Sequence, residues 1–283
     1  MSRVRGHFFQ PSECVVVPYA YSGQLLNATV ALNDQALAHG IPLKKLRRVY
    51  QALASVGAPH CPSLTLPRPG TSMWVPGLKS KPFLDRATPS FLRPLEEQQE
   101  AIRIECHAVI RNLDLDLHPN QHLVRLGQWK HFPLYSYGLK HKRNCNQMPQ
   151  TTHILEQIQQ VHGAGQVFLS LLSGCTHVVP HCGPFNHRLR CHLGLHIPPG
   201  TCGMRVAAES RTWLPGRCLI FDDSQEHELW NLSPEPQALL VVDYWHPDLT
   251  PEERWGLQTV LPFVLQQGTT NATSRGPELR TKL

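Results

Sequence analysis

The spacing of the hydrophobic residues changes from a helical to a strand-like period near residue 165. Before this point, apolar residues recur every three or four positions in several segments, which is typical of helices with one buried face. Between residues 166 and 243 they form short runs separated by turn residues, and several of these runs alternate with polar positions. Short runs at this spacing predict an antiparallel β-sandwich or barrel.

The N-terminal region predicts a loose arm followed by two helices. Leu26, Val30 and Leu37 are expected to share one face of the first helix, and Gly40 is expected to end it. The second helix begins at Pro42, and its predicted inner face repeats at intervals of three or four: Leu43, Leu46, Tyr50, Leu53 and Val56. Its opposite face is basic, which indicates either a solvated surface or a contact for an acidic partner: Lys44, Lys45, Arg47 and Arg48.

Three further features organise the rest of the chain. Eight prolines between residues 59 and 94 exclude a helix or a central strand and predict a linker or an extended wrap over the surface. More helices are expected from Pro94 to Leu113, from Thr152 to His162, and from a capping box at Thr250 onward. The polar residues 267–283 predict a disordered tail.

Seven or eight strands are predicted in the second half of the chain, at residues 166–172, 176–180, 187–195, 203–208, 211–214, 217–222, 226–230 and 237–243. The fold class that follows is mainly β with flanking helices. The chain divides into an arm with a helical hairpin, a proline-rich wrap, a β domain with flanking helices and a tail, at residues 1–58, 59–93, 94–266 and 267–283.

Composition narrows the class of protein. The chain has 283 residues, enough for one large domain, and its net charge of +6 is not gathered into one block, so nucleic-acid binding is not indicated. No apolar run approaches the roughly 20 residues of a membrane-spanning helix, and the N-terminus lacks the apolar core of a secretory signal. The sequence alone therefore favours a cytoplasmic location. Nine cysteines without a C-x-x-C pair exclude a fully paired disulfide scaffold.

His181 and His227 are the residues that point most directly to chemistry. His181 ends a predicted strand, and His227 lies 46 residues later beside another turn. Two histidines at the ends of neighbouring strands can hold a divalent metal. Many non-haem Fe(II) oxygenases add a carboxylate two residues after the first histidine, and here that position is Gly183. On spacing alone, the alternatives are hydrogen-bonded histidines at strand ends and a zinc site completed by Cys182 or Cys191.

Arg188, Arg190 and His192 form a second group of candidates. At the two-residue period of a strand they share one face, while the other face is apolar: Leu189, Cys191 and Leu193. An enclosed face with two arginines and a histidine needs an acidic counterpart, and a small dicarboxylate is one candidate. The alternative is that this face is solvated or paired with acidic residues of the chain: Asp222, Asp223 or Glu228.

Three runs of the sequence together resemble the aspartyl/asparaginyl β-hydroxylase family: PHCGPFNHRLRCHLGL, RTWLPGRCLIFDDSQEHELWN and VVDYWHPDLTPEER. The resemblance extends over about residues 72–265. It rests on a long series of uncommon short motifs that occur in the same order as in the family. It implies a double-stranded β-helix, a jelly-roll or cupin-like core, that works with Fe(II), 2-oxoglutarate and O2. The family binds iron through two histidines without a carboxylate, so Gly183 agrees with the resemblance.

The resemblance also implies roles for individual residues. His181 and His227 match the iron ligands of the family. Residues of the runs LRCH, FLSLL and GQWKHF match those that contact 2-oxoglutarate: Arg190, His192, Ser170 and Trp129. The implied activity is hydroxylation of the β-carbon of Asp or Asn residues in a protein or peptide substrate.

One position departs from the family pattern. The family carries a basic residue six positions before the aspartate of its VDxWHP motif, where it pairs with the distal carboxylate of 2-oxoglutarate. Here that position is Gln237. A neutral hydrogen bond in place of a charge-assisted one weakens binding by about 1–2 kcal/mol, or about 5- to 30-fold. The sequence is therefore also consistent with a second interpretation. The protein would be a weakened or inactive hydroxylase-like protein that works as a binding module.

Two further family properties do not carry over. Cys145 matches one half of a loop disulfide of animal members, but its partner position holds Thr152, so this disulfide is expected to be absent. Animal members are anchored in the endoplasmic reticulum by a transmembrane helix, which this sequence does not show. Three glycosylation triplets, at Asn27, Asn231 and Asn271, carry little weight because such triplets also occur by chance.

Overall fold

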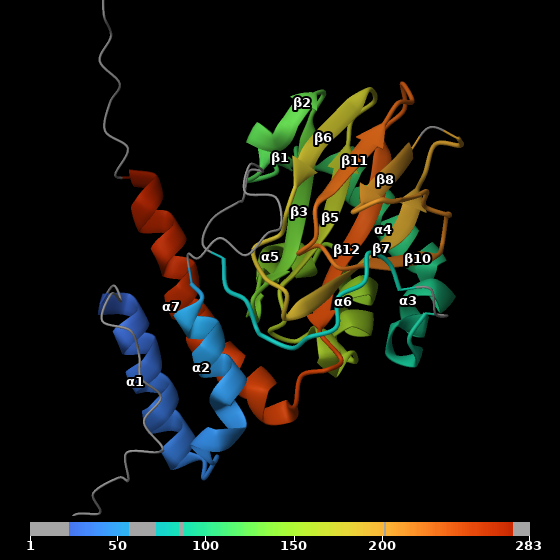
Figure 1. The fold of residues 1–283 in the computed structure, drawn as a ribbon. Coiled ribbons are helices and arrows are strands. Elements are labelled where there is room, and N and C mark those ends of the chain that lie inside the picture. The colour runs from blue at the N-terminus through green and yellow to red at the C-terminus, as the bar shows by residue number, and fades with distance from the viewer. Residues whose placement is uncertain (1–22, 57–71, 85–87, 201, 274–283) are drawn as a thin grey trace, which may run out of the picture.

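The computed structural model describes residues 23–56, 72–84, 88–200 and 202–273. Two antiparallel β-sheets lie face to face, and a cluster of three helices lies to one side of them (Figure 1). The predicted N-terminal arm, part of the proline-rich segment and the end of the predicted tail lie outside the described residues.

The larger sheet has seven strands, all paired antiparallel. In spatial order these are β1 (Asp116–Leu117), β3 (Trp129–Ser136), β5 (Gln166–Leu172), β12 (Gln237–Trp245), β7 (Arg188–His196) and β10 (Cys218–Phe221), with β4 (Leu139–Lys140) paired to β3. The smaller sheet has the order β2 (Val124–Leu126), β6 (Thr176–His181), β11 (His227–Asn231), β8 (Cys202–Val206) and β9 (Glu209–Arg211). The predicted double-stranded β-helix core is confirmed by this pair of facing sheets.

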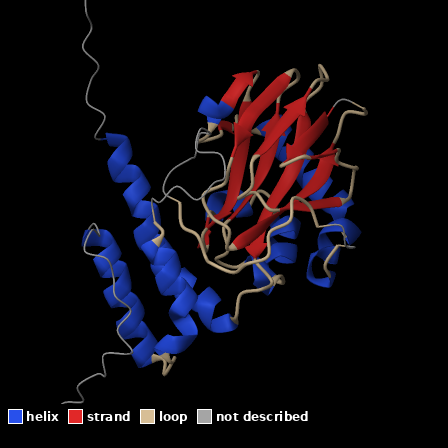
Figure 2. Ribbon diagram, viewed as in Figure 1, coloured by secondary structure: helices blue, strands red, loops and turns tan. Residues whose placement is uncertain are grey.

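Alternation along β12 separates two apolar cores. Ala238, Leu240 and Val242 pack under helices, whereas Leu239 and Val241 point into the barrel between the sheets. Figure 2 shows these helices behind the strands. Every residue of β12 is buried, which is why the strand reads as one apolar run that only two polar positions interrupt.

The helices behind the larger sheet are α3 (Arg93–Glu97), α4 (Gln99–Asn112), α5 (Lys142–Cys145) and α6 (Pro149–Glu156). The single helix predicted from Pro94 is in fact two helices, because the backbone leaves the helical region at Gln98, with φ −109° and ψ 19°. Helix α6 begins and ends earlier than predicted, and a 3-10 turn at Gln159–Val161 follows it.

Helices α1 (Gly23–Ala38), α2 (Arg47–Ala54) and α7 (Pro251–Thr273) pack together beside the barrel. The predicted inner face of α1 is wrong, since Leu26, Val30 and Leu37 are exposed by 57%, 48% and 83%. The buried face is the neighbouring one, and it alternates leucine with alanine: Leu25, Ala28, Leu32 and Ala36. In α7, Gly256 leaves room for its neighbours, because a Cβ there would lie 3.0 Å from Leu46, 3.2 Å from Val49 and 3.5 Å from Leu32 of α1.

Helix α2 follows the sequence prediction more closely. Leu46, Tyr50 and Leu53 are buried, although Leu43 is exposed. Its basic face is partly occupied, because Lys45 lies 2.6 Å from Glu252 and Arg48 pairs with Glu253 in the first turn of α7. Helix α7 continues to Thr273, past the predicted start of the tail at residue 267.

Residues 72–84 form a strap that joins the helical cluster to the barrel. The N–H of Met73 donates to the carbonyl of Pro184 at 3.0 Å, and the strap also forms a bridge between Phe83 and Phe221. The side chains of Met73, Val75 and Phe83 are buried. Residues 72–84 of the predicted extended wrap are therefore also part of the protein core.

Other elements were not anticipated. Strands β1 to β4 lie between residues 114 and 140, where the sequence pattern predicts none. Of the predicted strand at 211–214, only Arg211 is in a strand, at the end of β9. Across the described residues, no helix is both long enough and apolar enough to cross a membrane.

Candidate metal and co-substrate site

His181 and His227 meet at one end of the barrel, here named the histidine end. His181 is the last residue of β6, His227 is the first of β11, and the two are direct partners in the antiparallel ladder. Their ring centroids lie 4.2 Å apart, and both side chains are buried. Rings this close can both reach one ion, because metal–nitrogen bonds of this kind are about 2 Å long.

The hydrogen bonds of the two rings define which nitrogen is free. Nδ1 of His181 lies 2.8 Å from the carbonyl oxygen of Val179, and Nδ1 of His227 lies 2.9 Å from that of Gln225. Because a carbonyl oxygen only accepts, Nδ1 carries the proton in both rings and Nε2 presents a lone pair. No described residue forms a hydrogen bond with either Nε2. A backbone carbonyl on the far nitrogen is a usual partner of metal-binding histidines.

Both rings are neutral near pH 7. Burial lowers the pKa of His181. Burial and the neighbouring His181 ring lower the pKa of His227 to about 3. Neutral imidazole is the form that binds a metal ion.

Gly183 occupies the position at which a carboxylate would complete a three-ligand set. Its N–H donates to the backbone oxygen of Asp223 at 2.6 Å. A Cβ atom at residue 183 would lie 2.7 Å from Oδ2 of Asp223 and 2.8 Å from its backbone oxygen. Any side chain here would displace Asp223, so the packing at this end of the barrel accounts for the glycine.

The donor set therefore consists of two imidazoles. In the described part of the chain, no group of three or more His, Cys, Asp or Glu residues gathers to hold a metal. The zinc alternative is not supported, and Cys191 points away from the barrel into the helix-covered core. The chemistry of the site fits a divalent ion such as Fe(II), because Oδ1 of Asp223 is buried and unpartnered, and its negative charge acts on both histidines.

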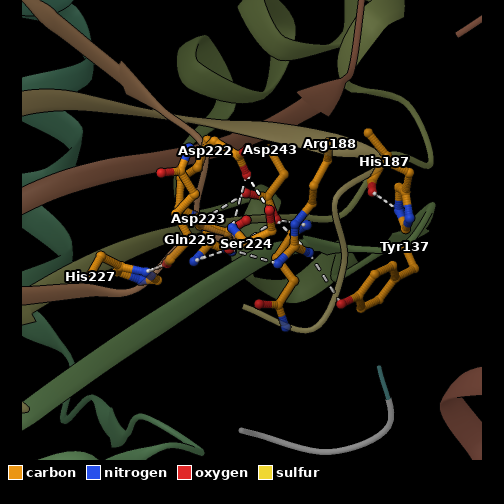
Figure 3. A network of polar contacts seen from close by, with 12 residues as sticks. Tyr137, His187, Arg188, Asp222, Asp223, Ser224, Gln225, His227 and Asp243 are labelled. Carbon is orange, nitrogen blue, oxygen red and sulfur yellow. Dashed lines mark hydrogen bonds and ion pairs between the residues drawn. The ribbon is translucent and has the colours of Figure 1, made fainter. Parts of the chain in front are cut away.

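Two arginines and two aspartates form an ion-pair cluster at the histidine end. Arg188, Asp223 and Asp243 are buried (Figure 3), and Arg190 is partly exposed. Arg190 lies 2.7 Å from Asp243 through Nε and 3.2 Å from Asp223 through Nη1. Arg188 lies 3.0 Å from Asp223 and 2.9 Å from Asp243. It also donates to the hydroxyl of Tyr137 at 3.3 Å. Two positive and two negative charges balance within the cluster.

The arginines and Asp223 stay ionised in spite of burial. Burial acts to lower the pKa of Arg188 and Arg190, but the carboxylates of Asp223 and Asp243 outweigh it and raise both values. Burial likewise acts to raise the pKa of Asp223. The two guanidinium groups outweigh this effect and hold that pKa well below its usual range.

Asp223 is one of the acidic partners expected from the sequence, whereas the sequence indicates Asp243 only as part of a motif. Asp222 and Glu228, the other candidates, do not pair with the arginines. Asp222 accepts hydrogen bonds from Ser80 and Ser224, while Glu228 contacts His177 and Arg205. The signal for Asp243 was its alternation with Val241 and Leu239 along β12, which places it on the inner face.

Trp129 and Ser170 lie on neighbouring strands, β3 and β5. Nε1–H of Trp129 donates to Oγ of Ser170 at 2.9 Å, and both side chains are buried. Because the hydroxyl accepts here, its own proton is available for a ligand. His118, which the sequence analysis did not single out, stacks on the indole with centroids 3.6 Å apart and planes 5° apart.

His192 faces the barrel interior from β7. Nε1–H of Trp213 donates to its Nδ1 at 3.3 Å, so the ring proton sits on Nε2 and is a donor. Burial, with the charge of Arg190 adding to it, lowers the pKa of His192 well below its usual value. The ring is therefore neutral, and its predicted contact with a co-substrate is a hydrogen bond from Nε2.

Gln237 lies at the opposite end of the barrel interior, here named the glutamine end. It is 0% exposed, and neither Nε2 nor Oε1 has a hydrogen-bond partner. Leaving a buried polar group unpartnered costs about 1–3 kcal/mol. At the glutamine end both polar atoms of the amide are thus unpaired among the described residues, whereas each charged side chain of the cluster at the histidine end has at least one partner.

The loop cysteine is a buried free thiol. Sγ of Cys145 lies 3.4 Å from the carbonyl oxygen of Leu134. Thr152, at the partner position, donates its hydroxyl to the backbone oxygen of Cys145 at 3.1 Å. A hydrogen bond thus joins the two positions that a disulfide would link.

A match to a family model identifies the family of this chain, and the matched residues include the whole candidate site. A family model described as aspartyl/asparaginyl beta-hydroxylase matches residues 96–247. The chain belongs to the aspartyl/asparaginyl beta-hydroxylase family. Both histidines and the arginine–aspartate cluster lie within the matched residues.

Relatives with different descriptions share this family. "Aspartyl/asparaginyl beta-hydroxylase" of Mus musculus is 38% identical over 192 residues, which cover 66% of this chain and 26% of that protein. This chain thus spans about a quarter of the mouse protein. "Aspartate beta-hydroxylase domain-containing protein 2" of Rattus norvegicus is 30% identical over 89% of this chain and 75% of its own length. "Ornithine lipid ester-linked acyl 2-hydroxylase" of Rhizobium tropici is 29% identical over 69% of this chain and 72% of its own length.

Solved structures of similar arrangement include two oxygenases. A 2OG-Fe(II) oxygenase family protein from Burkholderia pseudomallei aligns with a TM-score of 0.38 and 8% identity, over 62% of this chain and 98% of that one. A prolyl-4-hydroxylase from Pseudomonas putida aligns with a TM-score of 0.36 and 13% identity, over 53% of this chain and 87% of that one.

Proposed function

We propose that this protein is an Fe(II)- and 2-oxoglutarate-dependent hydroxylase that acts on the β-carbon of Asp or Asn residues in a protein or peptide. The observation that carries the proposal is the pair of neutral imidazoles of His181 and His227, whose Nε2 lone pairs have no partner in the described residues. Membership of a hydroxylase family supports the reaction class. The mouse relative's description supports Asp and Asn as the target residues.

His181 and His227 would hold the iron. Arg190 and His192 would hold the oxo-acid end of 2-oxoglutarate, and Ser170 and Trp129 would contact the co-substrate further along the barrel interior. When bound, Fe(II) with 2-oxoglutarate and O2 supplies the oxidation that replaces a C–H bond by C–OH.

The chain itself would orient the groups that bind the co-substrate and keep water away from them. Asp243 accepts two hydrogen bonds from Arg190, at 2.7 and 3.0 Å, which fixes the plane of the guanidinium group. The Ser170 hydroxyl and Nε2–H of His192 are neutral donors available to a carboxylate. Apolar residues exclude water from the space between the sheets: Phe168, Val178, Met204, Phe221 and Leu239.

One observation favours a second candidate, a binding module without turnover. Gln237 offers no positive charge to the distal carboxylate of 2-oxoglutarate, and two arginines of the barrel, Arg188 and Arg190, are already paired with aspartates. Weak co-substrate binding would leave an intact fold with little activity.

Succinate formation separates the two candidates. Purified protein, loaded with Fe(II) and 2-oxoglutarate, is offered Asp- and Asn-containing peptides, and succinate and the gain of one oxygen atom per peptide are measured. Turnover is expected in the wild type and is expected to be lost in His181→Ala and His227→Ala. His177→Ala is the matched control, because His177 lies on the same strand and pairs with Glu228 on the outer face.

The result that overturns the hydroxylase proposal is equally definite. It is the absence of succinate in both the wild type and Gln237→Arg, with every peptide, while both proteins bind Fe(II). That result would leave the binding module.

A further inference from the structure

Gln237 has the features of a ligand contact, because none of the described residues forms a hydrogen bond with its side chain. It is the first residue of β12, and its side chain shares the inner face with Leu239 and Val241. Nε2 and Oε1 are both buried, and neither has a hydrogen-bond partner. A folded protein rarely leaves both ends of a buried amide unpaired, so this amide implies a polar partner that enters the barrel.

The register of the strands places Gln237 in line with the candidate co-substrate contacts. Val241 is the ladder partner of His192, Leu239 is that of Ser170, and Gln237 lies two residues further along β12. At about 3.3 Å per residue, these polar groups follow one another over roughly 13 Å of the barrel interior. A ligand held at His192 and Ser170 therefore extends its far end toward Gln237.

The described ladder neighbours of Gln237 on β5 and β3 are uncharged. Its level in the sheet is shared by Leu172 of β5 and Trp129 of β3, which are ladder partners of each other. The paired charges lie at the histidine end, where Asp243 is six residues away along the same strand, or about 20 Å. The far end of a ligand thus meets a neutral amide, which can donate one hydrogen bond and accept another.

We propose that the glutamine end selects an uncharged polar group, so that the protein takes a 2-oxo acid with a neutral distal end at least as well as 2-oxoglutarate. The inference rests on the proposed function, which supplies the metal and the orientation of the oxo-acid end. A distal carboxylate would be buried without a countercharge, which is costly. A neutral carbonyl or amide loses less on leaving water and still bonds to Gln237.

Equilibrium binding tests this without turnover. The protein is loaded with Mn(II) under anaerobic conditions and titrated by calorimetry with 2-oxoglutarate, with its 5-methyl ester and with 2-oxohexanoate, whose far end is apolar. The wild type is expected to bind the ester at least as tightly as 2-oxoglutarate, and 2-oxohexanoate less tightly.

Variants of Gln237 are expected to move this preference in opposite directions. Gln237→Lys restores a cation and should tighten 2-oxoglutarate by about 5- to 30-fold relative to the ester. Gln237→Leu should remove the advantage of the ester over 2-oxohexanoate. Gln237→Glu, which is nearly isosteric, should weaken 2-oxoglutarate further and keep the comparison possible if lysine is not accommodated. Gln157→Lys, at an exposed helix end, is the control and should change nothing.

The outcomes separate the two proposals. A wild type that prefers 2-oxoglutarate over the ester by tenfold or more, with the same ratio in Gln237→Leu, would overturn the inference and leave the proposed function intact. A metal-loaded protein that binds none of the three 2-oxo acids would overturn both.

Discussion

The two ends of the barrel interior treat their buried polar groups in opposite ways. At the histidine end, Arg188 and Arg190 are enclosed together with Asp223 and Asp243, and each charge has a partner. At the glutamine end, Gln237 is equally buried and has none. Burial alone therefore does not separate these two cases. The difference is that each side chain of the cluster keeps at least one partner, whereas the amide of Gln237 has none among the described residues.

A second buried amide makes the contrast sharper. Asn231 is also 0% exposed, but its Nδ2 donates to the backbone oxygens of Ser173 and Glu235 at 3.0 and 2.8 Å. Its Oδ1 accepts from the N–H of Ser233 at 3.1 Å. Asn231 ties two turns together, so its glycosylation triplet is explained by structure and its side chain is inaccessible to modification in the folded protein.

The largest expected effect is at the histidine end. Asp243→Asn would leave Arg188 and Arg190 with one carboxylate between them, and removing one partner of a buried ion pair costs about 3–5 kcal/mol. We expect the free energy of unfolding, measured by urea titration, to fall by that amount. Asp114→Asn is the control, because Asp114 is 96% exposed in its pair with Lys130 and should have no measurable effect. A loss as small as that of the control would show that the cluster does not stabilise the barrel.

A moderate effect is expected at Gly183. Because a Cβ atom there meets Asp223, Gly183→Asp should lower the free energy of unfolding by about 1–3 kcal/mol. It should also weaken binding of Mn(II), measured by calorimetry, although it adds a carboxylate where many oxygenases have one. Gly23→Ala, where a Cβ meets nothing within 4 Å, is the control. Tighter metal binding in Gly183→Asp at unchanged stability would contradict the packing explanation.

The smallest change in the free energy of unfolding is expected at the glutamine end, and there it is an increase rather than a decrease. Gln237→Leu removes an unsatisfied amide and should raise the ligand-free stability by about 1 kcal/mol, measured as the urea midpoint. Asn231→Leu removes satisfied hydrogen bonds and should lower it. Equal losses in the two variants would show that Gln237 is a structural residue, and would contradict the comparison on which its proposed role rests.

Much of the barrel could be predicted from local pattern. The run at 166–172 coincides with β5, and alternation assigned the two faces of β7, with Leu189, Cys191 and Leu193 toward the helices. Strand β3 was missed because its sequence, WKHFPLYS, mixes polar and apolar residues and contains Pro133. The inner face of α1 was predicted wrongly because the helix carries leucines on two neighbouring faces, and the face that is buried is the one with Leu25, Ala28, Leu32 and Ala36.

By itself, the sequence determined which residues share a face, where the chain turns, and which family's motifs it carries, because these depend on neighbours a few positions apart. Only the tertiary structure decided that His181 and His227 are ladder partners, that Asp243 joins Asp223 between the arginines, and that Gln237 has no partner. Such contacts join strands dozens of residues apart. A side chain's period fixes the direction in which it points, but the packing of the whole barrel fixes what it meets.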